Sequence, residues 1–141
     1  MGWIFCRPQS CTLVTNKIFG DAVMDIDQIK KQLREFAEAR DWDQFHSPKN
    51  LASAISVEAA ELLEIFQWLS EENSRALDGA TKEKVEQEVA DVFLYLIRLA
   101  DKLDIDIIAA AGRKIAINEE KYPVALSKGN AKKYTEFKDE T

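Results

Sequence analysis

Apolar side chains recur at intervals of three and four residues along most of this sequence, and this pattern limits the chain to an all-helical fold. In the first such stretch, residues 25–42, they lie at Ile26, Ile29, Leu33, Phe36 and Ala37. This spacing gathers side chains on one side of an α-helix, whereas a half-buried β-strand needs strict alternation. No segment of the sequence alternates in that way. The chain is therefore predicted to be all-α.

Four helices are predicted, covering residues 25–42, 48–70, 81–103 and 105–121. Three of them start at residues whose side-chain oxygens can accept hydrogen bonds from first-turn N–H groups: Ser47 (followed by Pro48), Thr81 and Asp104. The Tyr122–Pro123 step ends the last helix, because a residue before proline avoids the helical region. Four amphipathic helices with short connections are expected to pack as a four-helix bundle.

The sequence divides into three parts: residues 1–23 as an N-terminal extension, residues 24–122 as the helical domain, and residues 123–141 as a C-terminal tail. The polar stretch 71–80 is expected to form a loop, and Gly129 marks a turn in the tail. Cys6 and Cys11 lie in the extension and, with His46 alone elsewhere, cannot complete a four-ligand zinc site. We interpret them as reduced thiols of a cytoplasmic protein.

Charge and hydropathy exclude two classes of partner. The 141-residue chain carries a net charge of −6, which argues against duplex nucleic acid as a partner, because that binding needs clustered Lys and Arg. No apolar run approaches the roughly 18 residues of a membrane span. We therefore predict a soluble protein in which any bound phosphate needs a metal ion to offset the acidic charge.

Two acidic pairs are the main candidates for chemistry: Glu58 with Glu61 on the second predicted helix, and Glu88 with Asp91 on the third. The members of each pair are three residues apart and share a helix face. If the helices pack antiparallel, four anions meet and repel one another unless a divalent cation binds. Carboxylate oxygens favour Mg²⁺, with Mn²⁺ as the alternative, over zinc or copper.

The competing interpretation is that these acids are solvated and form ordinary ion pairs along their helices. It is less favoured because Glu58 and Glu61 have no Lys or Arg at the pairing positions and stand among apolar residues.

The third helix also carries one continuous polar stripe: Glu88, Asp91, Tyr95, Arg98 and Lys102. One end of it is acidic and the other basic, and Asp91 and Arg98 are separated by roughly 10 Å along the axis. That distance is comparable with the length of a triphosphate held by metal at one end. On the last helix, Lys114, Asn118 and Lys121 share a stripe that could hold phosphate or base.

The order Glu58-x-x-Glu61, 26 residues, Glu88-x-x-Asp91 resembles the signature of the MazG-like all-alpha nucleotide pyrophosphohydrolases. Further segments resemble the dCTP-pyrophosphatase-like branch of that family: residues 40–46, Asn50-Leu51, Phe66-Gln67-Trp68, residues 91–96, Lys114, Asn118, residues 121–123 and residues 132–134. The resemblance spans residues 26–137.

The resemblance implies hydrolysis of a nucleoside triphosphate to the monophosphate and pyrophosphate, with dCTP or another deoxynucleotide as the candidate substrate. It implies that Glu58, Glu61, Glu88 and Asp91 hold Mg²⁺, and that a carboxylate activates the attacking water. Glu61 is our first choice for that role and Glu58 the second. It also implies a homodimer or homotetramer.

By the same resemblance, Lys114 and Lys121 contact phosphate, and Asn118 contacts the sugar or base. Trp42 and Trp68 flank the base, although ordinary packing explains tryptophans equally well. Tyr95 and Tyr122 also match substrate positions. Leu33 departs from dCTP-specific relatives, which can carry a polar residue there, so base preference stays open.

Two other functions were compared with this one. A ferritin-like di-iron bundle needs Glu-x-x-His pairs, and the only histidine, His46, falls in a predicted loop. A non-catalytic regulatory or adaptor protein that holds a basic partner in an acidic groove remains the main alternative. Within the enzyme class, a dUTP- or phosphoribosyl-ATP-directed relative would share the same bundle.

Overall fold

The computed structural model describes residues 24–140 and their side chains as far as Phe137. These residues form α-helices and two 3-10 helices, with no β-strand among them, so the all-α prediction is confirmed. They belong to two compact units, one ending at Asp104 and the other beginning at Ile105. The predicted N-terminal extension, residues 1–23 with Cys6 and Cys11, lies outside the described residues.

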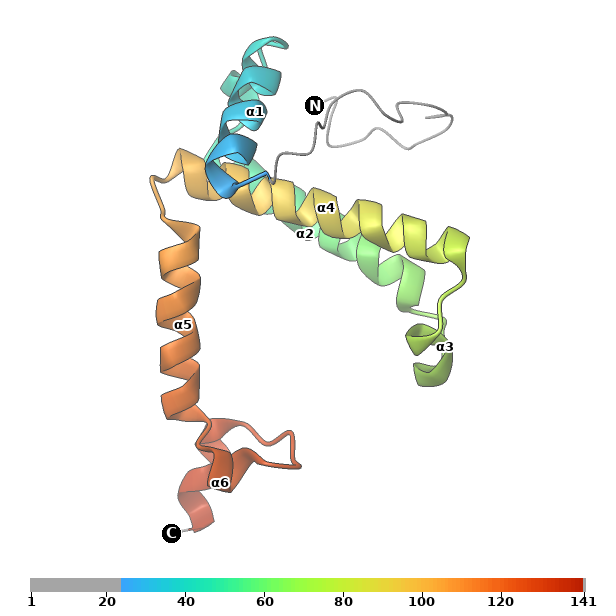
Figure 1. Ribbon diagram of the computed structural model, residues 1–141, viewed down its shortest axis with the longest axis vertical. Coiled ribbons are helices and arrows are strands. Elements are labelled where there is room, and N and C mark those ends of the chain that lie inside the picture. Colours follow the sequence, from blue (N-terminus) through green and yellow to red (C-terminus); the bar gives the residue numbers. More distant parts are fainter. Residues whose placement is uncertain (1–23, 141) are drawn as a thin grey trace. The chain divides into compact units, whose positions relative to one another are not determined.

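The first unit is built from three long helices, α1 (Ile26–Glu38), α2 (Pro48–Phe66) and α4 (Gly79–Lys102). Figure 1 shows α2 and α4 side by side and antiparallel, with α1 crossing the C-terminal part of α4. A short 3-10 helix, η1 (Asp43–Phe45), lies in the connection from α1 to α2. The polar connection from α2 to α4 contains α3 (Glu71–Arg75).

The apolar core of this unit lies between the N-terminal half of α2 and the C-terminal half of α4. Leu51, Ala54 and Tyr95 are buried against one another, and Ile55 and Leu99 pack on them. Both helices continue past this core into turns that still lie close together. Those next turns carry Glu58 on α2 and Asp91 on α4.

Two of the predicted helix starts are wrong, although the helices themselves are present. Asp78, not Thr81, caps α4, and its carboxylate accepts a 2.7 Å hydrogen bond from the Thr81 N–H. Asp106, not Asp104, caps α5 (Ile107–Lys121), because Asp104 has a φ of 52° and lies in the left-handed turn between the helices. In both cases a nearby polar residue has the extended backbone that a cap requires.

Other boundaries follow the sequence more closely. Ser47 caps α2 with Pro48 in the first turn, as predicted, and α5 ends at Lys121, immediately before the Tyr122–Pro123 step. The first helix ends earlier than predicted, at Glu38. Asp41 has a φ of 52°, which turns the chain so that the Trp42 N–H bonds back to the Ala37 carbonyl at 2.9 Å.

The helix α3 was not predicted, because its segment is short and polar. Ser70 nevertheless caps it by accepting a 3.1 Å hydrogen bond from the Asn73 N–H, and Glu71 and Glu72 occupy its first turn. Acidic side chains are favourable at a helix N-terminus, since they face unpaired N–H groups. The start signal therefore spanned the predicted boundary, with Ser70 assigned to the end of the second helix, which in fact ends at Phe66, and the two glutamates assigned to the loop.

The second unit contains α5, a single turn α6 (Val124–Ser127) and the 3-10 helix η2 (Tyr134–Glu140). The ring of Tyr122 contacts the rings of Tyr134 and Phe137 edge-on, at centroid distances of 6.0 and 6.2 Å. Gly129 has a φ of 78°, as a turn glycine does, and so the predicted turn is confirmed. These contacts bring residues 134–137 back to the end of α5.

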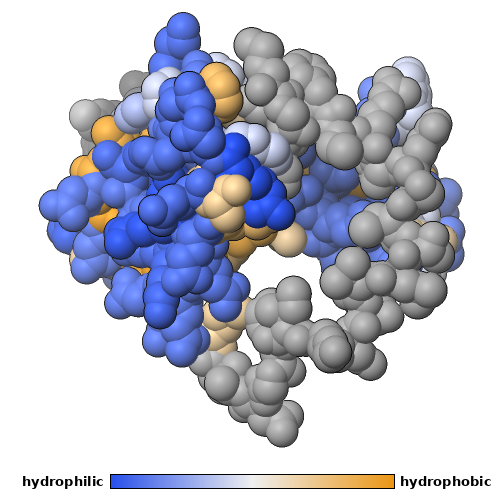
Figure 2. All heavy atoms as spheres, turned by 90° about the horizontal axis from the view of Figure 1, so that it is seen from above, coloured by the Kyte–Doolittle hydropathy of each residue, from blue (hydrophilic) through white to orange (hydrophobic). Residues whose placement is uncertain are grey.

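Several large apolar side chains remain on the surface of the first unit, and Figure 2 shows apolar patches among the hydrophilic residues of the face it presents. On α4, Val89, Phe93 and Leu96 are 49%, 42% and 38% exposed. Their spacing of four and three places them on one stripe. Within the described part of the chain, no helix is long and apolar enough to cross a membrane.

The corrected cap of α4 can be tested by unfolding. We expect Asp78→Ala to lower the free energy of unfolding by about 1 kcal/mol, since it leaves a first-turn N–H without its partner. Thr81→Ala keeps the acceptor on that N–H and should cost less. Urea denaturation followed by circular dichroism measures both, and an equal loss in the two variants would contradict the assignment.

Candidate active site

Three acidic side chains meet between α2 and α4. One carboxylate oxygen each from Glu58, Glu88 and Asp91 lies within 4.8 Å of the other two. We call these residues the three-acid group. Glu58 comes from α2, while Glu88 and Asp91 come from adjoining turns of α4, and the antiparallel packing of the two helices places them opposite each other.

The apolar core determines how deeply this group is buried. Glu58 follows Ala54 by one turn of α2, and Asp91 precedes Tyr95 by one turn of α4. Because Ala54 and Tyr95 are core residues, the acids begin where the core ends. Glu58 is only 7% exposed, and Glu88 and Asp91 are half-buried.

Burial and mutual repulsion both disfavour the charged forms of these acids. Burial raises the pKa of Glu58 to about 7, and the negative charges of Asp91, Glu61 and Glu88 add to the effect. Burial also raises the pKa of Glu88 and of Asp91, and in both cases the charge of Glu61 contributes. The four acids therefore act on one another electrostatically.

The ion pairs of the first unit all involve other acids, so among the described residues none of them offsets this negative charge. Buried carboxylates without a cationic partner are costly in free energy. A divalent metal ion would relieve that cost, and three carboxylate oxygens at this spacing suit the oxygen ligands that hard cations prefer. The three-acid group could therefore bind a metal ion.

Glu61 lies outside this close group. It is exposed on the following turn of α2, yet its charge raises the pKa of all three other acids. The structure thus brings three of the four predicted ligands together and leaves Glu61 nearby, on the solvent side.

The sequence model of the MazG-like family matches residues 53–137, which include all four acids. The chain is 40% identical to rat dCTP pyrophosphatase 1 over 114 residues, covering 79% of this chain and 67% of the relative. It is 36% identical to the human protein of the same name, with the same coverage of both chains.

A crystal structure of a pyrophosphatase from Archaeoglobus fulgidus is also similar, with a TM-score of 0.67 and 44% sequence identity. The similarity covers 76% of this chain and 99% of that one. The chain belongs to the MazG-like family. This confirms the family that the acidic signature indicated.

Tyr95 stands directly beside the acids of this MazG-like chain. It is buried in the core one turn after Asp91, and burial, together with the charges of Glu58 and Asp91, raises the pKa of its hydroxyl. Tyr95 therefore belongs to the apolar core and also lies near enough to Glu58 and Asp91 to feel their charge.

The two predicted base-binding tryptophans differ in their surroundings. Trp42 follows α1, is half-buried and packs edge-on against Phe36 with a centroid distance of 5.8 Å. Trp68 comes after the end of α2 and is 88% exposed. Packing therefore accounts for Trp42 in part, whereas an 88% exposed tryptophan is not explained by the packing of this chain.

The other predicted substrate residues belong to the second unit. Lys114, Asn118 and Lys121 are exposed on α5, and the Lys121 ammonium lies 5.0 Å from the centre of the Tyr134 ring. Tyr122 packs against Tyr134 and Phe137. Their contact with a substrate stays a prediction.

The basic end of the α4 stripe is not free to bind phosphate. Arg98 is 5% exposed and pairs with Asp43 and Asp101, and Lys102 also pairs with Asp43. The pairing of Arg98 with Asp101 could be expected from the sequence, because the two residues are three positions apart on one helix. Asp43 was not an evident partner, because it is 55 residues away and only the crossing of the elements brings it close.

A pH dependence of stability follows from the raised pKa values. The folded protein holds protons on the three-acid group at a pH where the unfolded chain has released them. In EDTA, the melting temperature should therefore fall as the pH rises from about 4.5 to about 7. Glu58→Gln should flatten this slope and raise the melting temperature at pH 7, while Glu64→Gln, an exposed change on the same helix, should do neither.

Adding Mg²⁺ should raise the melting temperature of the unsubstituted protein most at pH 7 and above, where the acids are charged. Scanning calorimetry at several pH values, with EDTA and with Mg²⁺, makes both comparisons. A slope that is the same in the Glu58→Gln variant would show that the group does not control stability in this range.

Proposed function

We propose that this protein uses Mg²⁺ to hydrolyse a deoxynucleoside triphosphate, with dCTP as the first candidate, to the monophosphate and pyrophosphate. The chain is a nucleoside triphosphate pyrophosphohydrolase, since it belongs to the MazG-like family and is similar to proteins named dCTP pyrophosphatase and to a solved pyrophosphatase. The three-acid group, unneutralised between α2 and α4, is the single observation that carries the proposal.

Magnesium would be held by Glu58, Glu88 and Asp91, with Glu61 as a fourth ligand from the next turn of α2. Only carboxylate oxygens are available in this group, which supports Mg²⁺, or Mn²⁺ in its place, over metals that prefer nitrogen or sulfur. When bound, such an ion supplies positive charge to the phosphate oxygens and to the attacking water.

Glu61 is our candidate for the residue that takes the proton from this water. Glu61 is exposed and lies outside the three-acid group, so its carboxylate can contact a water molecule while the other three acids keep their positions. Glu58 is the second candidate, because it is one of the carboxylates that would surround the ion and the attacking water. Little further chemistry is needed, since positioning and charge stabilisation dominate phosphoryl transfer.

Substrate contacts are proposed for Trp42, Trp68 and Tyr95 in the first unit and for Lys114, Asn118, Lys121 and Tyr122 in the second. The lysines suit phosphate oxygens, and Asn118 suits the sugar or base. Leu33 on α1 is half-buried, and its apolar side chain leaves the base preference open. This support comes from the family resemblance and from residue chemistry.

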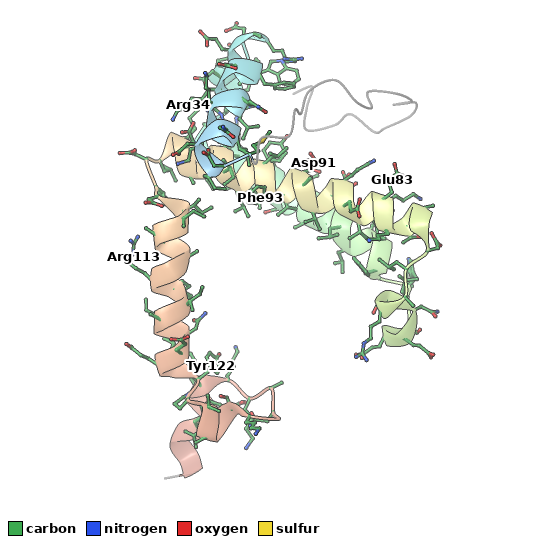
Figure 3. All side chains as sticks on the ribbon, in the orientation of Figure 1. Arg34, Glu83, Asp91, Phe93, Arg113 and Tyr122 are labelled. Atoms are coloured by element: carbon green, nitrogen blue, oxygen red, sulfur yellow. The ribbon has the colours of Figure 1, made fainter. Side chains whose placement is uncertain are left out.

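Self-association as a homodimer or homotetramer is also proposed. The support is the exposed apolar stripe of Val89, Phe93 and Leu96, because surface apolar side chains that share one helix face are typical of an interface. Figure 3 labels Phe93 and Asp91 on α4. They are two positions apart in the sequence, which is a rotation of about 200° around the helix axis. The stripe and the acids therefore face different directions. We place the enzyme in the cytoplasm, where its nucleotide substrates are found.

A product assay tests the proposed reaction. With Mg²⁺ and each common nucleoside triphosphate, we expect monophosphate and pyrophosphate from at least one deoxynucleotide. Glu61→Gln should lower kcat by about 10²–10⁴-fold, the usual range for losing a general base, while Glu64→Gln should retain activity. Orthophosphate with diphosphate would place the cut elsewhere. No hydrolysis of any nucleotide would favour the regulatory or adaptor alternative.

The proposed interface predicts the effect of a charge on the stripe. Phe93→Glu should shift the protein to a smaller species, because it buries a charge in an apolar contact. Sedimentation velocity measures the change, and Lys82→Gln, an exposed substitution on the same helix, is the control. If Phe93→Glu and the unsubstituted protein sediment alike, the stripe is not the interface.

A further inference from the structure

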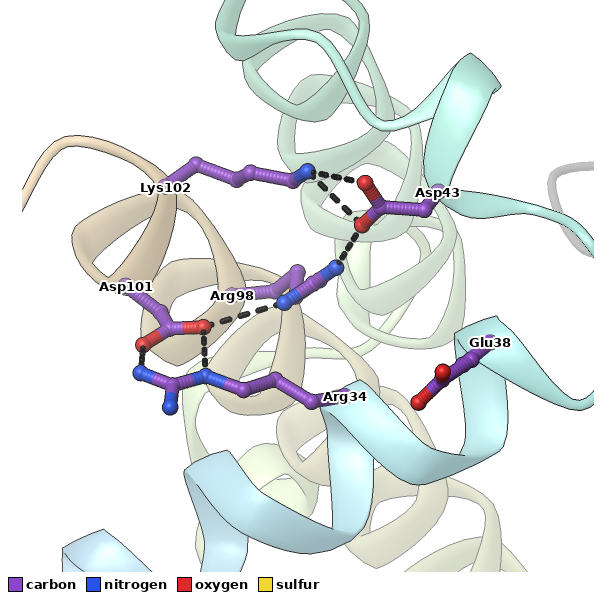
Figure 4. Close-up of a pocket in the computed structure, with 6 residues that line it drawn as sticks. All are labelled: Arg34, Glu38, Asp43, Arg98, Asp101 and Lys102. Carbon is purple, nitrogen blue, oxygen red and sulfur yellow. Dashed lines mark hydrogen bonds and ion pairs between the residues drawn. The ribbon is translucent and has the colours of Figure 1, made fainter.

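A chain of ion pairs ties three elements of the first unit together, separately from the three-acid group. Asp43 on η1 pairs with Arg98 on α4, and the Lys102 nitrogen lies 2.7 and 2.8 Å from its two carboxylate oxygens. Arg98 also binds Asp101 at 3.0 Å, and Asp101 in turn pairs with Arg34 on α1. Figure 4 shows these contacts. We call the five residues the ion-pair clamp.

The clamp borders a cavity of about 490 Å³, which is lined by its five residues and Glu38. The cavity is poorly suited to an anion. Three cations and three acids line it, and each of the three cations, Arg34, Arg98 and Lys102, already has a carboxylate partner. An anion would have to displace one of those carboxylates, so the charges here serve to hold the protein itself together.

Burial makes the centre of the clamp sensitive to change. The side chains of Arg98 and Asp101 are each only 6% exposed. Removing either one leaves the other buried charge with a single partner, Asp43 for Arg98 or Arg34 for Asp101. The hydrogen bond from Arg34 holds the pKa of Asp101 below its usual range, and the one from Lys102 does the same for Asp43. Both acids are therefore charged at neutral pH, as the clamp requires.

The clamp fixes the turn that carries Trp42. Asp43 follows Trp42 directly, and the Trp42 N–H is hydrogen-bonded to the Ala37 carbonyl of α1 at 2.9 Å. Trp42 is thus held to α1 on one side, while the next residue is held to Arg98 on the other. Arg98 stands seven residues after Asp91 on α4, which is roughly 10 Å along the axis. The helix that supplies two of the three acids therefore also positions Trp42.

We propose that Asp43 and Arg98 are positioning residues for the nucleoside: they fix Trp42 at a set place relative to the acids of α4. Their loss therefore weakens substrate binding more than it slows hydrolysis. This inference rests on the proposed function, since it takes Trp42 as a contact to the base of the substrate.

A double-mutant cycle tests this coupling. The readouts are the Kd for α,β-imido-dCTP with Mg²⁺, measured by calorimetry, and kcat for dCTP. We expect Asp43→Asn and Trp42→Ala each to raise the Kd about 10-fold, with kcat changed less than about threefold. The double variant should bind as weakly as Trp42→Ala alone. If Asp43 acts independently of Trp42, the increase in Kd of the double variant should equal the product of the two single increases, and that result would overturn the inference.

Two further variants complete the experiment. Asp43 is exposed, so Asp43→Asn is expected to fold, and circular dichroism checks this. If Asp43→Asn loses helix content, Arg98→Lys takes its place in the double-mutant cycle. This variant keeps the positive charge but loses the guanidinium geometry that contacts two carboxylates, and it should also raise the Kd. Lys82→Gln breaks an exposed ion pair with Glu86 at the other end of α4 and should leave the Kd unchanged.

The cycle also separates this inference from the function on which it rests. If Trp42→Ala leaves the Kd unchanged, Trp42 does not contact the base, and both the base assignment and the positioning role are wrong. If Trp42→Ala weakens binding but Asp43→Asn does not, only the positioning role is wrong. If the unsubstituted protein binds neither this analogue nor the α,β-imido analogue of any other common deoxynucleoside triphosphate, the proposed function fails and the positioning role is overturned with it.

Discussion

The close approach of Glu58 to Glu88 and Asp91 is the constraint on which the rest of this structure depends. Each carboxylate loses solvation, and each repels the others, so the arrangement opposes folding in the absence of a cation. It persists because α2 and α4 are held together one turn away by Leu51, Ala54 and Tyr95, whose burial is favourable. The apolar core thus maintains a charged arrangement that the acids alone would not adopt.

The helix α4 carries two kinds of charge cluster that are handled in opposite ways. Its acids, Glu88 and Asp91, have no basic partner among the described residues, whereas its cations, Arg98 and Lys102, are paired with Asp43. Lys102 also lies in the last turn, where the helix dipole favours positive charge. A charge that a protein neutralises internally stabilises its structure, and a charge left unneutralised is available for a ligand. This difference supports our proposal that the three-acid group is the reactive part of the molecule.

The sequence predicted the helices well because apolar spacing depends only on residues near one another in the chain. It failed at Thr81 and Asp104, where a second polar residue stood close by and the backbone conformation decided between them. The two acidic pairs were readable because each lies within one helix turn. The pairing of Arg98 with Asp43 was not, since it depends on how η1 meets α4, which local spacing does not encode.

The separation of these functions among elements has a consequence for substrate choice. The acids lie on α2 and α4, whereas Leu33 lies on α1 and Trp42 follows it. With the base contact that we propose for Trp42, changes on α1 or in its following turn can alter the recognition of a base and leave the carboxylates in place. This is one physical reason why a shared fold does not fix the substrate. The clamp limits that freedom, because it ties the turn after Trp42 and α1 to the helix that carries Asp91. Substitutions that preserve the clamp should then change base preference with the least effect on hydrolysis.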